Sequence, residues 1–186
     1  MDNGASSYRR FLDGDETGLV EIIRDYKDGL IFYLNGYVNN IFTAEDLVED
    51  TFVKLGVRKP KYNEKKASFK TWLYTIARNV AKDYLRRNAK TVEVSLERLG
   101  ELAHAEESLE QFYLWEERKI EVHHALRKLK PQYQQVLWLT YFEEFSNKET
   151  AGIMKKSVHS IETLVYRARQ ALKSELEKGG FCYEEL

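Results

Sequence analysis

Apolar residues recur every three or four positions along most of the chain, which is the period of an α-helix. Pro60 and Asn63 interrupt this pattern and predict a loop over 59–68. Repeated β-branched alternation is missing from the sequence, so we expect an all-α fold. In the first half of the chain the spacing predicts helices near 15–26, over Leu30–Val38, from about Thr43 to Val57, and over Phe69–Arg87.

Polar residues mark where these helices should begin. Asp15 and Ser68 are plausible caps of two of them, and Thr43 with Asp46 resembles a capping box. After residue 116 helical spacing returns, and Lys130–Pro131 predicts the start of a further helix because proline suits the first helical turn.

The last large segment predicts a short helix, a tight turn and a longer helix. Ser146 with Glu149 forms a capping box for the short helix, and Ser157 caps the long one. These are the parts of a helix-turn-helix, although an ordinary helical hairpin remains the alternative. Lys155 stands in the turn where glycine is common, and a lysine there would need a positive φ, which is unusual. The buried stripe of the long helix is expected at Val158, Ile161, Leu164, Val165, Ala168 and Leu172.

Residues 89–116 have mixed polarity and no sustained helical period. We therefore predict two small helical domains, 1–88 and 117–178, joined by a flexible acidic linker over 89–116 and followed by a tail over 179–186. The composition, with 43% hydrophobic and 32% charged residues, is typical of a globular protein.

Charge is strongly segregated although the net charge is only −1. Arg58–Lys90 holds eleven basic and two acidic residues, whereas 1–57 and 91–121 are both acidic. Aromatic residues, among them Trp72, are interleaved with the basic ones. A basic stripe attracts phosphate and aromatic faces stack on unpaired bases, so this segment predicts a nucleic-acid surface. The alternative is a solvated basic helix over an aromatic core.

Two predicted helices have well-separated faces. The polar side of the Phe69–Arg87 helix is expected to be uninterrupted and largely basic: Thr71, Thr75, Arg78, Asn79, Lys82 and Arg86. The helix Ala44–Val57 has an acidic face that includes one apolar residue, Val53, which favours a protein contact over a merely solvated face.

Several classes of protein are disfavoured. A single cysteine, Cys182, can form neither an internal disulfide nor a cysteine-rich zinc site. No apolar run approaches membrane-spanning length and the N-terminus lacks a signal-peptide core, so we expect a cytoplasmic protein without membrane insertion. The sequence has no Walker-type glycine loop, nucleophile elbow or paired metal-ligand motif, and the adjacent His123 and His124 point to different sides of a helix. We expect no enzyme activity, no metal and no cofactor.

At this point the segments resemble one family. AEDLVEDTFVKL (Ala44–Leu55) followed by ASFKTWLYTIARNVAKDYLRR (Ala67–Arg87) is similar to region 2 of the extracytoplasmic-function (ECF) sigma factors, and Tyr133–Leu172 resembles their region 4. The order and spacing agree, and the likeness covers nearly all of the chain except the linker and tail. The resemblance implies an alternative sigma factor that binds core RNA polymerase and directs promoter-specific transcription initiation.

The resemblance also implies roles for individual residues. The clamp helices of the largest polymerase subunit would be bound by Asp46, Glu49, Asp50 and Val53. The −10 element would be captured as a single strand by Lys61, Tyr62, Lys65, Lys66, Trp72, Arg78, Asn79, Lys82, Asp83, Arg86 and Arg87. The −35 element would be contacted in the major groove by Ser157, His159, Ser160, Glu162, Thr163, Tyr166, Arg167 and Gln170.

Other implied partners are the polymerase flap, promoter DNA and an anti-sigma factor, and the linker would run through polymerase toward the RNA exit path. Two departures from the family pattern stand out. Thr75–Ile76 replace the tryptophan pair with which housekeeping sigma factors open the duplex, which implies a weaker melting wedge. Glu162 replaces a basic residue and implies an atypical −35 preference. The alternative function is a stand-alone helix-turn-helix regulator, which leaves the helices 44–57 and 69–87 unexplained.

Overall fold

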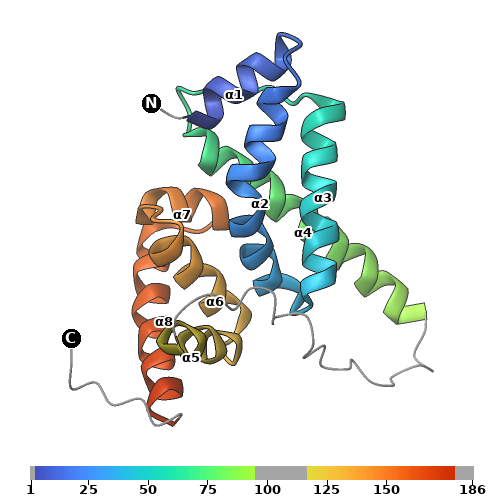
Figure 1. The fold of residues 1–186 in the computed structure, drawn as a ribbon. Helices are drawn as coiled ribbons and strands as arrows, with labels where there is room; N and C mark the ends of the chain where they lie inside the picture. The colour runs from blue at the N-terminus through green and yellow to red at the C-terminus, as the bar shows by residue number, and fades with distance from the viewer. Residues whose placement is uncertain (1–2, 95–116, 179–186) are drawn as a thin grey trace.

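The computed structural model describes residues 3–94 and 117–178, and the regular elements within these ranges are all helical, which confirms the predicted class (Figure 1). Most of the predicted linker and the tail lie outside the described residues. The elements are α1 (Asn3–Leu12), α2 (Thr17–Val38), α3 (Ile41–Arg58), α4 (Phe69–Val94), α5 (Glu117–Arg127), α6 (Pro131–Leu137), the π-helical turn η2 (Trp138–Phe142), α7 (Asn147–Met154) and α8 (Val158–Lys178).

Local capping explains where the N-terminal helices begin. Ser68 Oγ accepts the N–H of Thr71 at 3.2 Å before α4, as predicted. The residue at the N-cap of α2 is Glu16 and not the predicted Asp15, although the Asp15 carboxylate accepts the N–H of Thr17 at 3.0 Å. Helix α3 begins at Ile41, two residues before the predicted start near Thr43. Its cap is Asn40, whose side chain accepts the N–H of Thr43 at 2.9 Å, and not Thr43 itself.

Helix α2 joins two helices that the sequence predicts separately, and Gly29 lies inside it. A Cβ at this position would collide with the side chains of Glu143 and Tyr74, which come from distant parts of the chain. The glycine is thus explained by close packing against α2 and not by a break in the helix.

The helix-turn-helix has the predicted local geometry. Ser146 Oγ accepts the N–H of Glu149 at 3.3 Å, and Glu149 accepts the N–H of Ser146 at 3.1 Å, which completes the capping box. Lys155 adopts the left-handed conformation, with φ 53° and ψ 52°, and Ser157 Oγ accepts the N–H of Ser160 at 3.1 Å. Val158 is 40% exposed, so its assignment to the buried stripe was wrong.

The N-terminal helices α1–α4 and the C-terminal helices α5–α8 pack directly against one another (Figure 1). Helix α6 lies on α2, α7 lies on α4, and buried residues of both groups form one hydrophobic cluster. Two buried or half-buried side chains of α6 and η2 bond to backbone carbonyls of α2: Gln135 Nε2 to Gly36 at 2.8 Å and Trp138 Nε1 to Gly29 at 3.1 Å. The sequence does not predict this contact between the two helical groups.

Candidate nucleic-acid interface

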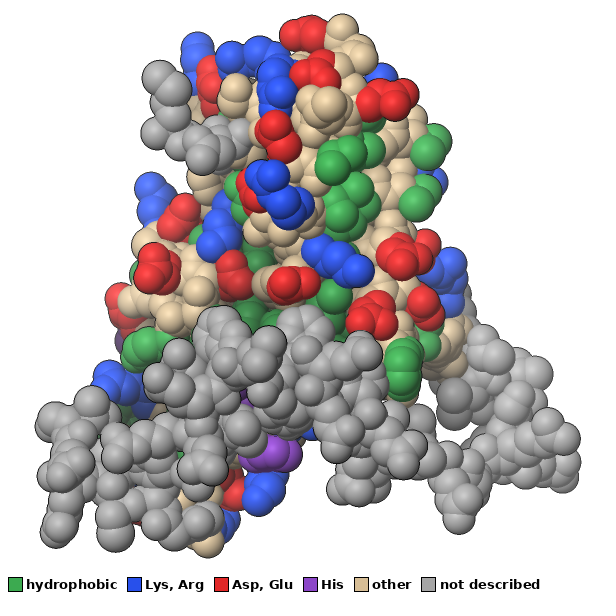
Figure 2. All heavy atoms as spheres, viewed as in Figure 1, with side chains coloured by type: hydrophobic (Ala, Val, Ile, Leu, Met, Phe, Trp, Pro, Cys, Tyr) green, Lys and Arg blue, Asp and Glu red, His purple; other side chains and the backbone are tan. Residues whose placement is uncertain are grey.

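The predicted polymerase-binding residues lie together on one open face of α3. Asp46, Glu49 and Asp50 are exposed, and the Val53 side chain is 60% exposed although it is apolar. The opposite face of α3 supplies buried apolar residues to the core. Acidic side chains are visible along the side of the molecule on which α3 lies, interspersed with basic and apolar ones (Figure 2).

The loop over 59–68 presents lysines and is anchored by aromatic rings. Lys61, Lys65 and Lys66 are exposed, whereas Tyr62 is half-buried and donates its hydroxyl to the carbonyl of Ala67 at 3.0 Å. The loop is also tied to α1, because the Tyr8 hydroxyl donates to the carbonyl of Pro60 at 2.8 Å. Burial raises the pKa of Tyr8 to about 12, so this donor keeps its proton at neutral pH.

Trp72 belongs to this aromatic cluster. It is half-buried, and its ring centroid lies 5.2 Å from that of Tyr62, 5.3 Å from that of Tyr8 and 5.5 Å from that of Phe69. These neighbours hold the indole in place while part of it remains open to solvent. The two interpretations of the aromatic residues, core and base-stacking platform, are therefore compatible at this position.

The second half of α4 carries an open polar stripe. Lys82, Asp83, Arg86 and Arg87 are exposed, and Asn79 is half-buried. Arg86 bonds to Asp83 at 3.2 Å, but such an exposed pair contributes little, so the guanidinium can still bind phosphate.

A groove of about 540 Å³ joins two of the predicted surfaces. Its lining comes from α3 and α4, so candidate polymerase-binding and −10-binding residues share it: Asp50, Val53, Lys54, Val57, Arg58, Val80, Asp83, Arg86 and Arg87.

The first half of α4 differs from the prediction. Thr71 is buried and donates its hydroxyl to Glu149 of α7 at 3.1 Å, and Arg78 Nη2 donates to the carbonyl of Met154 at 3.3 Å. The polar face of α4 is therefore not uninterrupted, because α7 covers it at Thr71 and Arg78. Periodicity separates polar from apolar faces but does not show that a polar face packs on another helix.

The predicted −35 residues occupy the first part of α8. Seven of them are exposed, and the eighth, Thr163, is half-buried and donates its hydroxyl to the carbonyl of His159 at 3.1 Å. The Glu162 carboxylate lies 3.9 Å from Nδ1 of His159, and none of the described lysines pairs with it. The exposed seven are Ser157, His159, Ser160, Glu162, Tyr166, Arg167 and Gln170.

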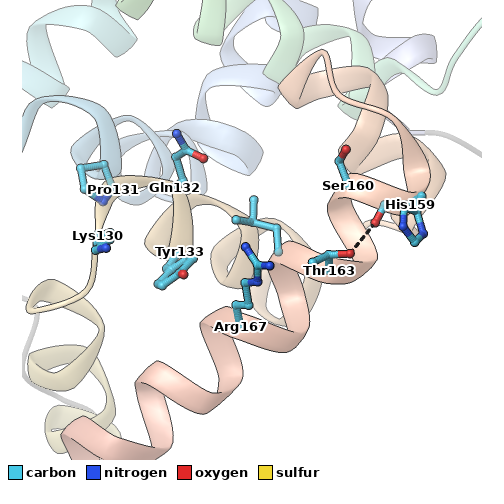
Figure 3. Close-up of a pocket in the computed structure, with 9 residues that line it drawn as sticks. Lys130, Pro131, Gln132, Tyr133, His159, Ser160, Thr163 and Arg167 are labelled. Carbon is cyan, nitrogen blue, oxygen red and sulfur yellow. Dashed lines mark hydrogen bonds between the residues drawn. The ribbon is translucent and has the colours of Figure 1, made fainter.

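Beside this helix lies a pocket of about 620 Å³ (Figure 3). One wall comes from the start of α6 and includes Lys130 and Tyr133, and the other comes from α8 and includes Thr163 and Arg167. The Arg167 side chain extends from α8 toward the α6 side (Figure 3). The sequence identifies Lys130–Pro131 only as a helix start, so its place beside α8 was missed.

Neither a metal-binding cluster nor a membrane-spanning helix occurs among the described residues. No group of three or more His, Cys, Asp or Glu side chains there has the arrangement of a metal site. None of the described helices is long and apolar enough to cross a membrane.

Models of known protein families match both halves of the chain. The model of Sigma-70 region 2 matches residues 22–91, and that of Sigma-70 region 4 matches residues 119–172. The chain is 33% identical to RNA polymerase sigma factor YlaC of Bacillus subtilis strain 168, over 85% of this chain and 91% of that protein. It is 29% identical to ECF RNA polymerase sigma factor SigM of the same strain, over 86% of this chain and 95% of that protein.

Solved structures show the same fold. Sigma factor RpoE, in complex with the anti-sigma factor NepR from Bartonella quintana, matches with a TM-score of 0.66 and 23% identity, covering 84% of this chain and 95% of that one. CnrH, in complex with the cytosolic domain of CnrY, matches with a TM-score of 0.60 and 21% identity, covering 95% and 96%. The chain therefore belongs to the ECF family of RNA polymerase sigma factors and directs transcription initiation as an alternative sigma factor.

Proposed function

We propose that three surfaces divide the work of promoter recognition: α3 binds core polymerase, α4 with the 59–68 loop binds the −10 element, and α8 binds the −35 element. The observation that carries this proposal is the presence, in one chain, of an exposed recognition helix and a separate basic surface with an aromatic platform. A duplex-binding regulator needs only the first of these.

The polymerase contact is assigned to the face of α3 that carries Asp46, Glu49, Asp50 and Val53. Its exposed carboxylates complement a basic surface, and Val53 adds apolar area that gains from burial. The partner proposed for this face is the pair of clamp helices of the largest subunit, and the C-terminal helices contact the flap.

The −10 element is assigned to α4 and the 59–68 loop as single-stranded DNA. The lysines of the loop and Arg86 and Arg87 attract the backbone, and the open part of Trp72 accepts a base leaving the stack. Both Thr75 and Ile76 are half-buried and lack the flat surface of tryptophan, so this surface captures melted DNA more than it forces the duplex open.

The −35 contact is assigned to duplex DNA in the major groove. Tyr166, Arg167 and Gln170 project from α8 toward solvent, within reach of base edges and phosphates. The adjoining pocket, with Lys130 on its other wall, suits a sugar–phosphate segment of the same duplex. Glu162 adds an acceptor that can bond to the cytosine amino group.

The regulator proposed for this chain is a protein of the anti-sigma class, as in the complexes of RpoE and CnrH. No catalytic step of its own is assigned to the chain.

Run-off transcription with purified core polymerase over a promoter library tests the function. We expect initiation only when both the chain and core are present, and the selected promoters reveal the −10 and −35 sequences.

Asp50→Lys should weaken core binding, Arg86→Ala should reduce use of every promoter, and Arg167→Ala should reduce dependence on the −35 element. The matched control is Arg24→Ala, an exposed arginine on α2 outside all three surfaces. Promoter binding that is equally tight without polymerase would contradict the proposal and favour a stand-alone regulator.

A further inference from the structure

Helix α1 precedes the segment that matches the Sigma-70 region 2 model, yet it contacts the loop of the proposed −10 surface. The loop over 59–68 passes beside α1 on its way from α3 to α4 (Figure 1). The contacts between α1 and this loop include those of Tyr8 with Pro60, Arg9 with Glu64, and Phe11 with Lys59.

These contacts differ in how firmly they hold the loop. The side chains of Arg9 and Glu64 are 69% and 65% exposed, so their ion pair contributes little. Lys59 is exposed as well, and its Nζ lies 4.8 Å from the centroid of the Phe11 ring. Tyr8 is only 1% exposed, and its hydroxyl donates to the loop backbone at 2.8 Å. The Tyr8 bond is therefore the firmest of the three, because breaking it leaves a polar group unpaired in a buried side chain.

The same side chain contacts the proposed base platform on α4. The centroid of the Tyr8 ring lies 5.3 Å from that of Trp72 and 5.6 Å from that of Phe69. Tyr62 of the loop approaches the indole of Trp72 from its own side at 5.2 Å. Tyr8 thus joins the loop, through its hydroxyl, to the platform, through its ring.

Helix α1 is itself fixed against α2. Ser7 Oγ donates to the Glu21 carboxylate at 2.7 Å, and Arg10 donates to the same carboxylate. A Cβ at Gly18 of α2 would collide with the backbone of α1 at Ser7, so the two helices are in direct backbone contact. Tyr8 therefore projects from a firmly placed support.

The loop has bonds that preserve its own shape. Asn63 Oδ1 accepts the N–H of Lys65 at 3.0 Å, and the Asn63 carbonyl accepts the N–H of Lys66 at 3.0 Å. These bonds form a local turn that does not involve α1. The contact with α1 consequently determines where this turn lies, more than which conformation it adopts.

The position of the turn matters because its lysines and Trp72 act on the same strand in the proposed function. A loop displaced from the indole would hold the backbone at a different distance from the base platform. We propose that Tyr8 is a positioning residue for the −10 element, which fixes the 59–68 loop relative to Trp72 and thereby sets the base preference of this surface. The effect on DNA rests on the function proposed above, whereas the placement of the loop does not.

Hydrogen exchange of the loop in the free, full-length chain tests its placement. Tyr8→Phe removes the hydroxyl and keeps the ring, and exchange over 59–68 should become about fivefold faster, the effect of losing one hydrogen bond. The matched control is Thr51→Val, which removes another buried hydroxyl, one that donates to the Leu47 carbonyl at 2.7 Å within α3. This control should leave loop exchange unchanged, and circular dichroism checks that the helices persist.

Arg9→Ala removes the exposed ion pair and should change loop exchange by less than about twofold. Unchanged loop exchange in Tyr8→Phe, or an equal acceleration in Thr51→Val, would overturn the proposal.

Selection from the promoter library with core polymerase tests the effect on DNA. Tyr8→Phe should reduce the preference for the favoured base at the most selective −10 position by about fivefold and leave the −35 preference unchanged. Tyr8→Leu lacks the ring as well and should reduce the −10 preference further. A merely structural role would lower transcription from all promoters without changing the preferred base, as we expect of Thr51→Val.

The two measurements separate the possible failures. Faster loop exchange with an unchanged −10 preference in Tyr8→Phe refutes the positioning role alone. A parent chain that does not initiate with polymerase refutes the proposed function, while hydrogen exchange still decides whether Tyr8 places the loop.

Discussion

At the scale of single residues, Trp72 and Arg86 separate folding from DNA binding. Trp72 contacts three other aromatic rings, whereas the Arg86 side chain is 72% exposed and touches only Asp83 among the described ion pairs. Trp72→Ala should lower the free energy of unfolding by about 2 kcal/mol, less than for a fully buried tryptophan, and Arg86→Ala by less than about 0.5 kcal/mol. Urea denaturation and run-off transcription of both variants check this. Reduced transcription in Trp72→Ala alone would remove Arg86 from the −10 surface.

Glu162 tests how far a single side chain sets promoter preference. Its exposed carboxylate lies 3.9 Å from Nδ1 of the exposed His159, so it is open to DNA. Glu162→Arg should shift the selected −35 bases away from cytosine toward guanine, since arginine bonds to guanine O6 and N7. Selection from the promoter library measures the shift, with Lys173→Arg farther along α8 as the control. An unchanged −35 preference would show that Glu162 does not read a base.

At the scale of elements, the turn between α7 and α8 carries a conformational cost. Lys155 is left-handed at φ 53°, which disfavours a side chain with a Cβ by about 1 kcal/mol. Lys155→Gly should therefore raise the free energy of unfolding by about 0.5 kcal/mol, while Lys156→Gly, where φ is not positive, should lower it by a similar amount. Urea denaturation compares them. A destabilised Lys155→Gly would mean that the lysine side chain makes a stabilising contact in the turn.

Elements with strong local signals were predictable and their mutual contacts were not. Helix starts are marked by three serines that accept a terminal N–H, namely Ser68, Ser146 and Ser157. Another start is marked by Pro131, which has no N–H to satisfy. Helix α1 was missed, since it joins the core mainly through Tyr8 and Phe11 and has no long apolar stripe. The bond from Thr71 to Glu149 spans 78 positions, and no periodic pattern indicates a polar contact at such a separation.

At the scale of the whole molecule, the proposed function needs a more extended arrangement than the one in the structure. The structure packs α7 against α4, whereas the proposed contacts of α4 with the −10 element and of α8 with the −35 element place these helices far apart. Residues 95–116 connect α4 to α5 in the sequence, so their number limits how far apart the two groups of helices can lie. The length of this connection, more than its sequence, should then decide which promoters the chain can use.

Residues 95–116 number 22 and span at most about 75 Å when fully extended. Deleting 100–111 leaves 10 of them, or about 35 Å, which shortens the maximum reach between the two DNA surfaces by about 40 Å, whereas the promoter elements lie about 85 Å apart. The deletion should leave core binding in a pull-down unchanged but reduce run-off transcription at the normal spacing by about tenfold or more.

Replacing 100–111 by glycine and serine of equal length should preserve activity. Removing one helical turn of DNA, about 34 Å, between the elements should partly restore the deleted chain. Full activity of the deletion at normal spacing would show that the linker does not limit the reach between the two promoter elements.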